Sequence, residues 1–457
     1  MKTSFSLIAL LAAPAASLCP FGFDKPSAGQ SGQYPSALAG SATDHPHGLA
    51  QIASLELAPP PQPTPEYTEA MHSLDIAAVQ SDLKTLMTNS QDWWPADYGN
   101  YGPFFIRLAW HCSGTYRATD GRGGCSGGRQ RFEPEASWED NTNLDKARRL
   151  LWPIKEKYGL GLSWGDLFIM AGTTAIESMG GPTLGVCVGR VDDEDGARSV
   201  GLDECVGGVN GKCEAPMGST TKELIYVNPE GPMGQPIPDQ SAVEVRDTFK
   251  RMGMKDRETV ALIGGGHTFG KSHGACKSKY AEGMAGLSPE KTTALGLDPS
   301  TQAWQGECGT GKGADTWTSG IEGSWTTNPT AWDNSYFRNL LNYGWHVEEG
   351  PGGKHQWMVS ETYGPQAPSS DGTGRQDIMM LTTDMALLND PASKYQELVK
   401  EFATDAPALD EAFAAAWHKL TTRAFGSEKA PRCVTKVKAT LRPGATAFAS
   451  NICSATK

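Results

Sequence analysis

The chain has 457 residues and a formal net charge of −12, with the composition of an ordinary globular protein. This length allows one large domain or two smaller ones, and either arrangement can bury a deep site. The acidic balance argues against nucleic acid or an anionic membrane surface as the main partner.

The first residues have the pattern of a cleaved signal peptide, which we place at residues 1–18. Lys2 precedes an apolar run from Leu7 to Ala13, and small residues follow at 15–17. The run is too short to span a bilayer, and a buried core helix is the alternative explanation. We therefore expect a secreted, extracellular protein with no membrane partner.

Residues 19–75 are predicted to be a linker or pro-segment. They are rich in Pro, Gly, Ser and Ala and include the proline-dense stretch 58–65. Such a composition buries too little apolar surface to fold alone.

Residues 76–430 are predicted to form one mainly α-helical domain with few short strands. Apolar residues recur at a spacing near that of a helix, strand-like alternation is scarce, and no repeat of fixed period divides the region. Polar or acidic residues stand at three expected helix starts, where free N–H groups and the helix dipole favour them (Asn143, Ser163, Asp256). The expected helices cover 81–87, 101–116, 143–158, 163–178, 242–252, 256–264 and 410–424, with Gly-rich loops at 117–142, 179–220 and 270–322.

The chain contains ten cysteines, which an exported protein is expected to pair in disulfides. Short separation along the chain favours Cys205 with Cys213 and Cys433 with Cys453, although the sequence leaves the connectivity open. We expect the C-terminal tail, 431–457, to be held to the domain through its cysteines. The chain has no CxxC motif that would indicate zinc or a redox site.

One predicted helix carries an arginine and a histidine on the same face. Arg107 and His111 are four residues apart, and Trp110 flanks them. Cleavage of an O–O bond needs a base that moves a proton between the oxygens and a cation that stabilises the developing negative charge. His111 and Arg107 suit these two roles. The alternative is an ordinary Arg–His pair on a partly exposed helix.

A second predicted helix ends in three glycines and a histidine. Gly264, Gly265 and Gly266 would let a flat ligand approach the backbone closely, and His267 follows them as a candidate axial ligand for iron. The alternative is a capped helix end that binds no ligand.

The stretches around His111 and His267 resemble the distal and proximal signatures of the haem peroxidase superfamily of plants, fungi and bacteria. Other motifs between Ser81 and Ala424 resemble the catalase-peroxidases of its class I branch. These motifs are 120–124 (DGRGG), 130–132 (QRF), 145–155 (DKARRLLWPIK), 226–232 (YVNPEGP) and 332–335 (WDNS). The resemblance implies the haem peroxidase fold, in which one haem b per chain lies between a distal and a proximal helix.

The resemblance also implies roles on the distal side of the haem. It makes Arg107, Trp110 and His111 the distal group. Asn141 matches the residue that hydrogen-bonds the distal histidine and keeps its other ring nitrogen basic. A helix cap is the alternative role for Asn141.

On the proximal side, the resemblance makes His267 the axial ligand of the haem iron. Asp384 matches the carboxylate that accepts the His267 N–H, and Trp325 matches the indole beside that pair. A carboxylate partner makes the imidazole more electron-rich. Without the resemblance, Asp384 would be an ordinary cap and Trp325 an ordinary core residue.

Three oxidisable side chains, Trp110, Tyr226 and Met252, match a covalent Met–Tyr–Trp adduct that this family ties to release of dioxygen. Arg423 matches the mobile arginine that responds to the adduct tyrosine. As alternatives, Met252 fills a gap in the core and Tyr226 is a half-buried aromatic residue.

The resemblance implies an enzyme that reduces hydrogen peroxide through a ferryl state and oxidises small aromatic donors, phenols among them. It would act as a monomer or homodimer in peroxide removal under oxidative stress. Bacterial catalase-peroxidases carry a second, haem-free copy of the domain that we do not expect here, so we expect peroxidase activity more firmly than catalase activity.

The signal peptide and added cysteines resemble the single-domain hybrid peroxidases of fungi. Lignin-type and plant-type secreted peroxidases fit less well, because they carry Phe where Trp110 stands. A secreted peroxidase without catalase activity and a non-enzymatic haem-binding protein remain as alternatives.

Overall fold

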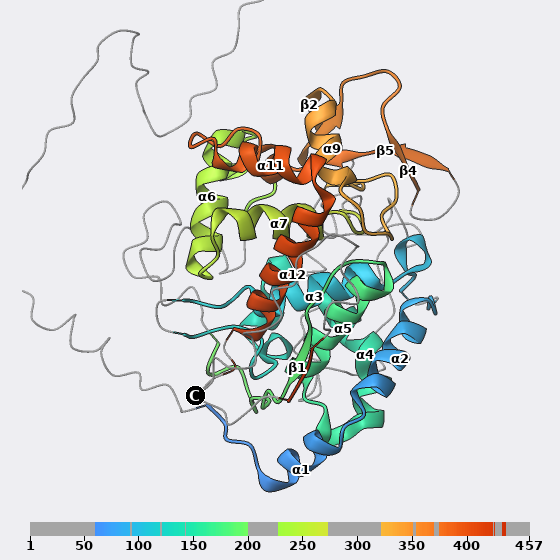
Figure 1. The fold of residues 1–457 in the computed structure, drawn as a ribbon, viewed down its shortest axis with the longest axis vertical. Helices are drawn as coiled ribbons and strands as arrows, with labels where there is room; N and C mark the ends of the chain where they lie inside the picture. Colours follow the sequence, from blue (N-terminus) through green and yellow to red (C-terminus); the bar gives the residue numbers. More distant parts are fainter. Residues whose placement is uncertain are drawn as a thin grey trace, which may run out of the picture. The chain divides into compact units, whose positions relative to one another are not determined.

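The computed structural model of the protein describes residues 60–91, 94–118, 121–141, 143–199, 227–272, 321–350, 353–369, 374–423, 425 and 432–435. The chain divides into two compact units, Met1–Glu56 and Leu57–Lys457, and every described residue belongs to the second. In that unit the described residues form mainly α-helices with a few short strands (Figure 1), as the sequence predicts.

Two long helices, α3 (Gly102–Ser113) and α5 (Trp164–Ser178), pack against each other in the core. Their close approach depends on Gly172, because a Cβ added there would lie 2.5 Å from the Cβ of Ala109. The neighbouring helices are α1 (Pro65–Ser73), α2 (Ile76–Met87) and α4 (Leu144–Tyr158). Short 3-10 turns lie at Asp97–Gly99, Arg129–Arg131, Glu135–Ser137, Glu139–Asn141 and Gly159–Gly161.

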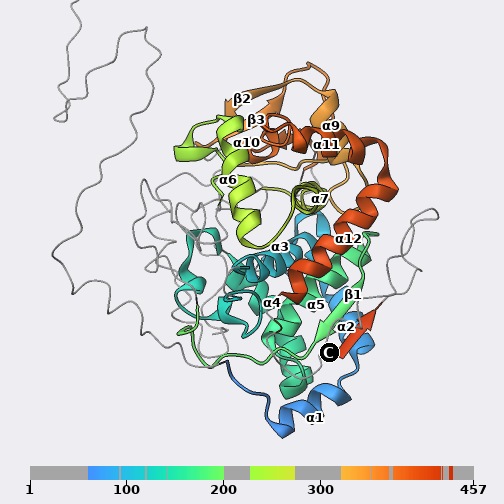
Figure 2. The ribbon, with the colours of Figure 1, turned by 60° about the vertical axis from the view of Figure 1, so that its left-hand side comes forward.

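Helix α12 (Ala406–Thr422) connects the later helices to this core. It packs against α7 (Asp256–Gly266) and also contacts α3. Figures 1 and 2 both show α12 running past α7 towards α3, with α7 above α3. The remaining helices of the described residues are α6 (Pro238–Arg251), α9 (Ser335–Asn342), α10 (Thr382–Met385) and α11 (Lys394–Thr404), with a 3-10 turn at Pro232–Gly234.

The strands form three small antiparallel sheets among the described residues. β2 (Trp345–Glu349), β3 (His355–Val359) and β6 (Met379–Met380) form one sheet in the order β2-β3-β6. β4 (Gln366–Pro368) pairs with β5 (Arg375–Asp377), and β1 (Gly185–Val188) pairs with β7 (Arg432–Thr435). Because β6 leads almost directly into α10, the three-stranded sheet sets the position of α10.

Each helix expected from apolar spacing is present, with ends that differ by a few residues. The structure adds α1, which lies inside the stretch 19–75 that the sequence assigns to a linker. Tyr67 and Met71 of α1 are buried, and the Tyr67 hydroxyl donates to the carbonyl of Arg190 at 2.6 Å. Within the described part of the chain, the helical region therefore begins at Pro65, earlier than residue 76.

The helix starts follow the predicted chemistry in part. Ser163 caps α5 by accepting from the N–H of Asp166 at 3.1 Å, and Asp256 and Glu258 stand in the first turn of α7. Asn143 is the cap residue of α4, but its side chain makes no capping hydrogen bond, and its backbone is left-handed with φ of 70°. Helices α9, α10 and α11 were not expected.

Two disulfides are present among the described residues, and one of them corrects the expected pairing. Cys433 on β7 is joined to Cys187 on β1 across a separation of 246 residues, so the pairing of Cys433 with Cys453 is wrong. Antiparallel pairing of β1 and β7 places the two residues opposite each other. The other disulfide joins Cys112 to Cys125. The suggested pair of Cys205 and Cys213 lies outside the described residues.

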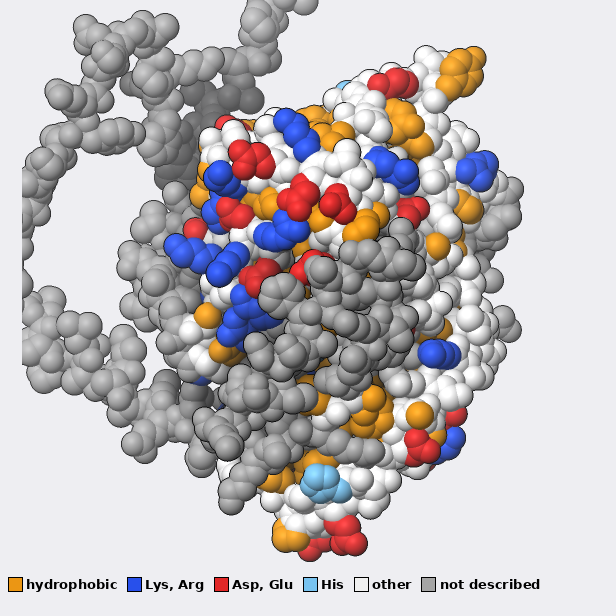
Figure 3. Space-filling view, viewed as in Figure 1, with side chains coloured by type: hydrophobic (Ala, Val, Ile, Leu, Met, Phe, Trp, Pro, Cys, Tyr) orange, Lys and Arg blue, Asp and Glu red, His pale blue; other side chains and the backbone are white. Residues whose placement is uncertain are grey.

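The face shown in Figure 3 carries acidic and basic side chains next to each other in its upper part, over the region of α6, α7 and α11. A salt bridge joins Arg257 of α7 to Glu401 of α11 at 2.7 Å, and both side chains are exposed. Charge on this face is therefore mixed in sign. Within the described ranges, no helix has both the length and the apolar character needed to cross a membrane.

Candidate active site

Helix α3 carries Arg107 and His111 one turn apart. His111 is buried, and its Nδ1 lies 2.9 Å from Oδ1 of Asn141. Asn141 donates its Nδ2–H to the backbone carbonyl of Glu135 at 2.7 Å, which fixes the orientation of the amide. Oδ1 of Asn141 therefore accepts the Nδ1–H of His111, and Nε2 of His111 keeps its lone pair.

The surroundings of His111 favour its neutral form. Burial, followed by the guanidinium of Arg107, lowers the pKa of His111 well below 6.5, and the hydrogen bond that His111 donates to Asn141 opposes this shift. Arg107 donates from Nη2 to the backbone carbonyl of Asp140 at 2.6 Å. The carboxylate of Asp140 lies 3.8 Å from His111 Nδ1, too far for a hydrogen bond. Near pH 7 the site therefore presents a neutral imidazole beside a guanidinium cation.

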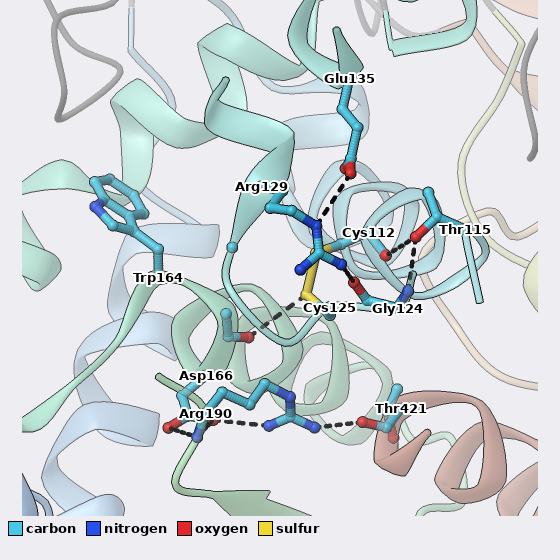
Figure 4. Close-up of a disulfide and its surroundings, with 12 residues drawn as sticks. Cys112, Thr115, Gly124, Cys125, Arg129, Glu135, Trp164, Asp166, Arg190 and Thr421 are labelled. Atoms are coloured by element: carbon cyan, nitrogen blue, oxygen red, sulfur yellow. Dashed lines mark hydrogen bonds and ion pairs between the residues drawn. A yellow bond between two sulfur atoms is a disulfide. The ribbon is translucent and has the colours of Figure 1, made fainter. Parts of the chain in front are cut away.

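A disulfide and a buried ion pair support the segment that carries Asn141 (Figure 4). Cys112, next to the distal histidine, is joined to Cys125. Arg129 lies in the following turn, and its Nε is 3.5 Å from Oε1 of Glu135. Burial raises the pKa of Glu135, and Arg129 opposes that change. Because the carbonyl of Glu135 holds the Asn141 amide, this cluster fixes the partner of the distal histidine.

A second buried pair, between a residue that follows β1 and one on α5, ties α5 to the end of α12 (Figure 4). Arg190 and Asp166 are both fully buried, with Nη1 and Oδ1 2.7 Å apart. Burial raises the pKa of Asp166, and Arg190 opposes that change. Arg190 also donates to the carbonyls of Cys187, at 2.7 Å, and of Thr421. Thr421 lies two residues before Arg423, so this pair anchors the end of α12 that carries Arg423.

The structure describes two of the three predicted adduct residues, Trp110 and Met252, and Tyr226 lies outside the described residues. The ring of Trp110 stacks on Phe249 of α6, with centroids 5.3 Å apart. Met252 caps the C-terminal end of α6 and is fully buried. A Cβ added to the glycine after Met252 would lie 3.3 Å from Nη2 of Arg423. Trp110 and Arg423 therefore both lie near the C-terminal end of α6, where Met252 is the cap residue.

His267 lies at the C-terminal end of α7 and is held by Asp384 of α10. Nδ1 of His267 is 2.7 Å from Oδ1 of Asp384, whose side chain is fully buried. Trp325 donates its indole N–H to Oδ2 of Asp384 at 2.8 Å and stacks on the imidazole, with centroids 4.2 Å apart. The structure thus assembles the three residues of the expected proximal group from separate elements.

Tyr336 of α9 is a further member of this group that the sequence did not reveal. Its hydroxyl donates to Oδ1 of Asp384 at 2.7 Å, the same oxygen that faces His267. Its ring meets the imidazole edge-on, with centroids 6.0 Å apart. Burial and the charge of Asp384 raise the pKa of Tyr336 well above its ordinary value, so the hydroxyl stays protonated and acts as a donor. Its position directly after the 332–335 motif was the one available signal.

Two of the three glycines before the proximal histidine have a packing role that the sequence did not predict. A Cβ added at Gly264 would lie 2.2 Å from the ring of Phe337, and one at Gly265 would lie 2.2 Å from the ring of Phe413. These two glycines let α9 and α12 pack against α7. Of the three, Gly266 alone faces space that is free of described atoms within 4 Å.

The proximal group fits a haem iron. Asp384 occupies Nδ1 of His267, so Nε2 is the ring nitrogen available to a metal. The His267 side chain keeps 28% exposure while that of Asp384 has none, so the ring reaches out of the buried cluster. A neutral imidazole that is oriented by a carboxylate is a common donor to haem iron. His267 is therefore the residue that would hold the iron.

Comparison with known sequences identifies the family. The sequence profile described as Peroxidase matches residues 79–405. This chain belongs to the peroxidase family. Over 372 residues it is 52% identical to a catalase-peroxidase of Halobacterium salinarum, a match that covers 79% of this chain and 51% of the relative. A catalase-peroxidase of Natronomonas pharaonis is 51% identical over 376 residues, with the same two coverages.

A third relative, catalase-peroxidase 2 of Legionella pneumophila, is 50% identical over 368 residues, which are 79% of this chain and 48% of the relative. This peroxidase thus spans about half the length of the curated relatives that it matches. It is similar to catalase-peroxidases over the part that contains both histidines.

Proposed function

We propose that this peroxidase is a haem-dependent enzyme that reduces hydrogen peroxide with electrons from small aromatic donors such as phenols. The observation that carries the proposal is the 2.7 Å contact between His267 Nδ1 and Asp384, which leaves one ring nitrogen for iron. The cofactor we propose is haem b, one per chain. The family match and the arrangement of Arg107 and His111 support the proposal.

The chemistry of the distal group follows from its hydrogen bonds. When bound, the haem supplies the electrons that reduce the O–O bond. Nε2 of His111 takes a proton from one oxygen of hydrogen peroxide and returns it to the leaving oxygen. The guanidinium of Arg107 stabilises the negative charge that develops there. Asn141 occupies Nδ1 and so reserves Nε2 of His111 for proton transfer.

Absorption spectroscopy tests this proposal. The purified protein should show a Soret band that shifts when hydrogen peroxide is added and returns when a phenolic donor follows. A Soret band that does not respond to peroxide would contradict the enzymatic proposal and favour a haem-binding protein without activity. A protein that takes up no haem would contradict both.

A second proposed activity is release of dioxygen from hydrogen peroxide. The observation that favours it is that Trp110 and Arg423 both lie near the end of α6 that Met252 caps, and Tyr226 is the third residue of the proposed Met–Tyr–Trp adduct. Mass spectrometry of tryptic peptides from the peroxide-treated parent should detect the cross-link. Tyr226→Phe should lose most oxygen evolution and still oxidise phenols at a near-parent rate. A parent with neither cross-link nor oxygen evolution would be a peroxidase without catalase activity.

We further propose that the protein is secreted and removes peroxide outside the cell under oxidative stress. The signal-like residues at 1–18 support this, as do the two disulfides, since disulfides persist in oxidising compartments. Expression of the full chain should yield protein in the medium with an N-terminus downstream of the apolar run. Protein retained in the cytosol with Met1 in place would contradict export.

A further inference from the structure

The carboxylate of Asp384 accepts hydrogen bonds from four donors. Oδ1 accepts from Nδ1–H of His267 and from the hydroxyl of Tyr336, each at 2.7 Å. Oδ2 accepts from the indole of Trp325 at 2.8 Å and from the backbone N–H of Leu381 at 2.7 Å. A carboxylate offers about four lone-pair positions, so each of them has a donor. On Oδ1, the oxygen that faces the proximal histidine, two donors share one atom.

Packing holds the Tyr336 hydroxyl in this position. Tyr336 and Asp384 are both fully buried. The next residue, Phe337, packs its ring against Gly264 of α7, where a Cβ would lie 2.2 Å from the ring. Phe337 also meets the ring of Tyr336 edge-on, with centroids 5.1 Å apart. The close fit of α9 on α7 therefore fixes Tyr336 against the same oxygen that His267 uses.

We propose that Tyr336 is a positioning residue that sets, through Asp384, how strongly His267 donates electrons to the haem iron. The inference rests on the proposed ligation of iron by His267. A hydrogen bond from the hydroxyl draws electron density from Oδ1 and weakens its pull on the Nδ1–H of His267. The imidazole then has less imidazolate character and is a weaker donor. Tyr336 thereby raises the Fe(III)/Fe(II) reduction potential.

Tyr336→Phe tests the inference, because it keeps the ring and removes the hydroxyl. We expect the Fe(III)/Fe(II) midpoint potential to fall. The equilibrium constant for one-electron reduction of the iron should decrease by up to about tenfold, which corresponds to about 59 mV. The iron–histidine stretching frequency of the ferrous protein, measured by resonance Raman spectroscopy, should rise because imidazolate character increases. An unchanged midpoint overturns the proposal.

The sign of the change separates tuning from simple support. If the hydroxyl only held Asp384 in place, its removal would let the carboxylate move away from His267. The imidazole would then lose its partner, and the midpoint would rise. A higher midpoint together with a lower iron–histidine frequency therefore also overturns the proposal.

Two further proteins complete the experiment. Tyr395→Phe removes a hydroxyl from another fully buried tyrosine, on α11, and should leave the midpoint unchanged. A fluorotyrosine with a more acidic hydroxyl at position 336 should donate more strongly to Asp384 and raise the midpoint. The fluorotyrosine protein keeps the proposal testable if Tyr336→Phe binds haem poorly, and a midpoint that does not rise overturns it.

Failure of this inference is distinguishable from failure of the proposed function. If His267→Ala keeps haem with an unaltered spectrum, the assignment of the iron ligand fails. If His267→Ala loses haem while Tyr336→Phe leaves the midpoint and the Raman frequency unchanged, the ligand assignment stands and the role of Tyr336 fails alone.

Discussion

The two histidines of the site give their Nδ1–H groups to partners of different charge. His111 faces the neutral amide of Asn141, whereas His267 faces the carboxylate of Asp384. A neutral partner fixes the tautomer without adding charge, so His111 can take up a proton and release it again. A carboxylate makes the ring electron-rich, which suits a ligand of iron. The partner of Nδ1 therefore determines which of two roles an imidazole can serve.

Removal of the proximal histidine is expected to have the largest effect of all the substitutions, and that effect is on haem binding. His267→Ala should abolish tight haem retention, because no other atom of the proximal group replaces Nε2. Soret absorbance after gel filtration measures retention. His346→Ala is a matched control, since His346 lies on β2 with its side chain 46% exposed, and it should keep the haem. A His267→Ala protein with the parent's Soret band would contradict the assignment of His267 as the iron ligand.

The distal histidine should affect rate and not haem binding. His111→Ala should slow the first spectral change after mixing with hydrogen peroxide by about 10²- to 10⁴-fold, the usual contribution of a positioned base. Arg107→Leu should slow it less, because the base remains. Stopped-flow absorbance measures both at matched haem content. Parent-like rates in either variant would contradict the role given to that residue.

Exchanging the partner of the distal histidine tests the comparison directly. The pKa of His111 is lowered by burial and Arg107, so its base function is retained as pH falls through 6.5 and is lost only at lower pH. Asn141→Asp adds a carboxylate and should raise this pKa by about 1–3 units. The acid limb of the peroxide rate should therefore move to higher pH by the same amount.

The matched control for this exchange is Asp140→Asn. It removes a carboxylate 3.8 Å from His111 Nδ1 and should move the acid limb slightly in the opposite direction. If Asn141→Asp left the acid limb in place, the charge of the partner would not govern the distal histidine.

Local sequence patterns predict the helices and the distal group. Arg107 and His111 share a face because they are four residues apart on one helix, and that spacing needs no tertiary information. Apolar periodicity likewise predicts α3, α4, α5 and α7. It misses α1, α9, α10 and α11. Of these, α1 follows a proline-rich stretch and α10 is too short to show a period.

The proximal group depends on contacts that local patterns do not encode. Asp384 and His267 are 117 residues apart, and the resemblance to catalase-peroxidases, not spacing, brought them together. Tyr336 was missed because its role arises from how α9 packs on Gly264. The pairing of Cys187 with Cys433 was missed for the same reason, since β1 and β7 meet only in the folded chain.

The smallest effect is expected from the aromatic ring that supports the distal tryptophan. Phe249 stacks on Trp110, and its hydrocarbon side chain has no atom that could hydrogen-bond to Arg107 or His111. Phe249→Leu keeps an apolar side chain of similar size and should lower the free energy of unfolding by about 1–2 kcal/mol through loss of the stack. The rate of the peroxide reaction should change by less than about threefold, since the base and the cation keep their partners.

Trp325→Phe is the proximal counterpart of Phe249→Leu. It should lower the free energy of unfolding further, because it also removes a hydrogen bond to a buried carboxylate, a contribution of about 1.5–3 kcal/mol. Chemical denaturation measures the free energy of unfolding of both variants. If Phe249→Leu slowed the peroxide reaction as severely as His111→Ala, the position of Trp110 would be part of the distal proton transfer, and the distal side would depend on ring packing as closely as the proximal side does.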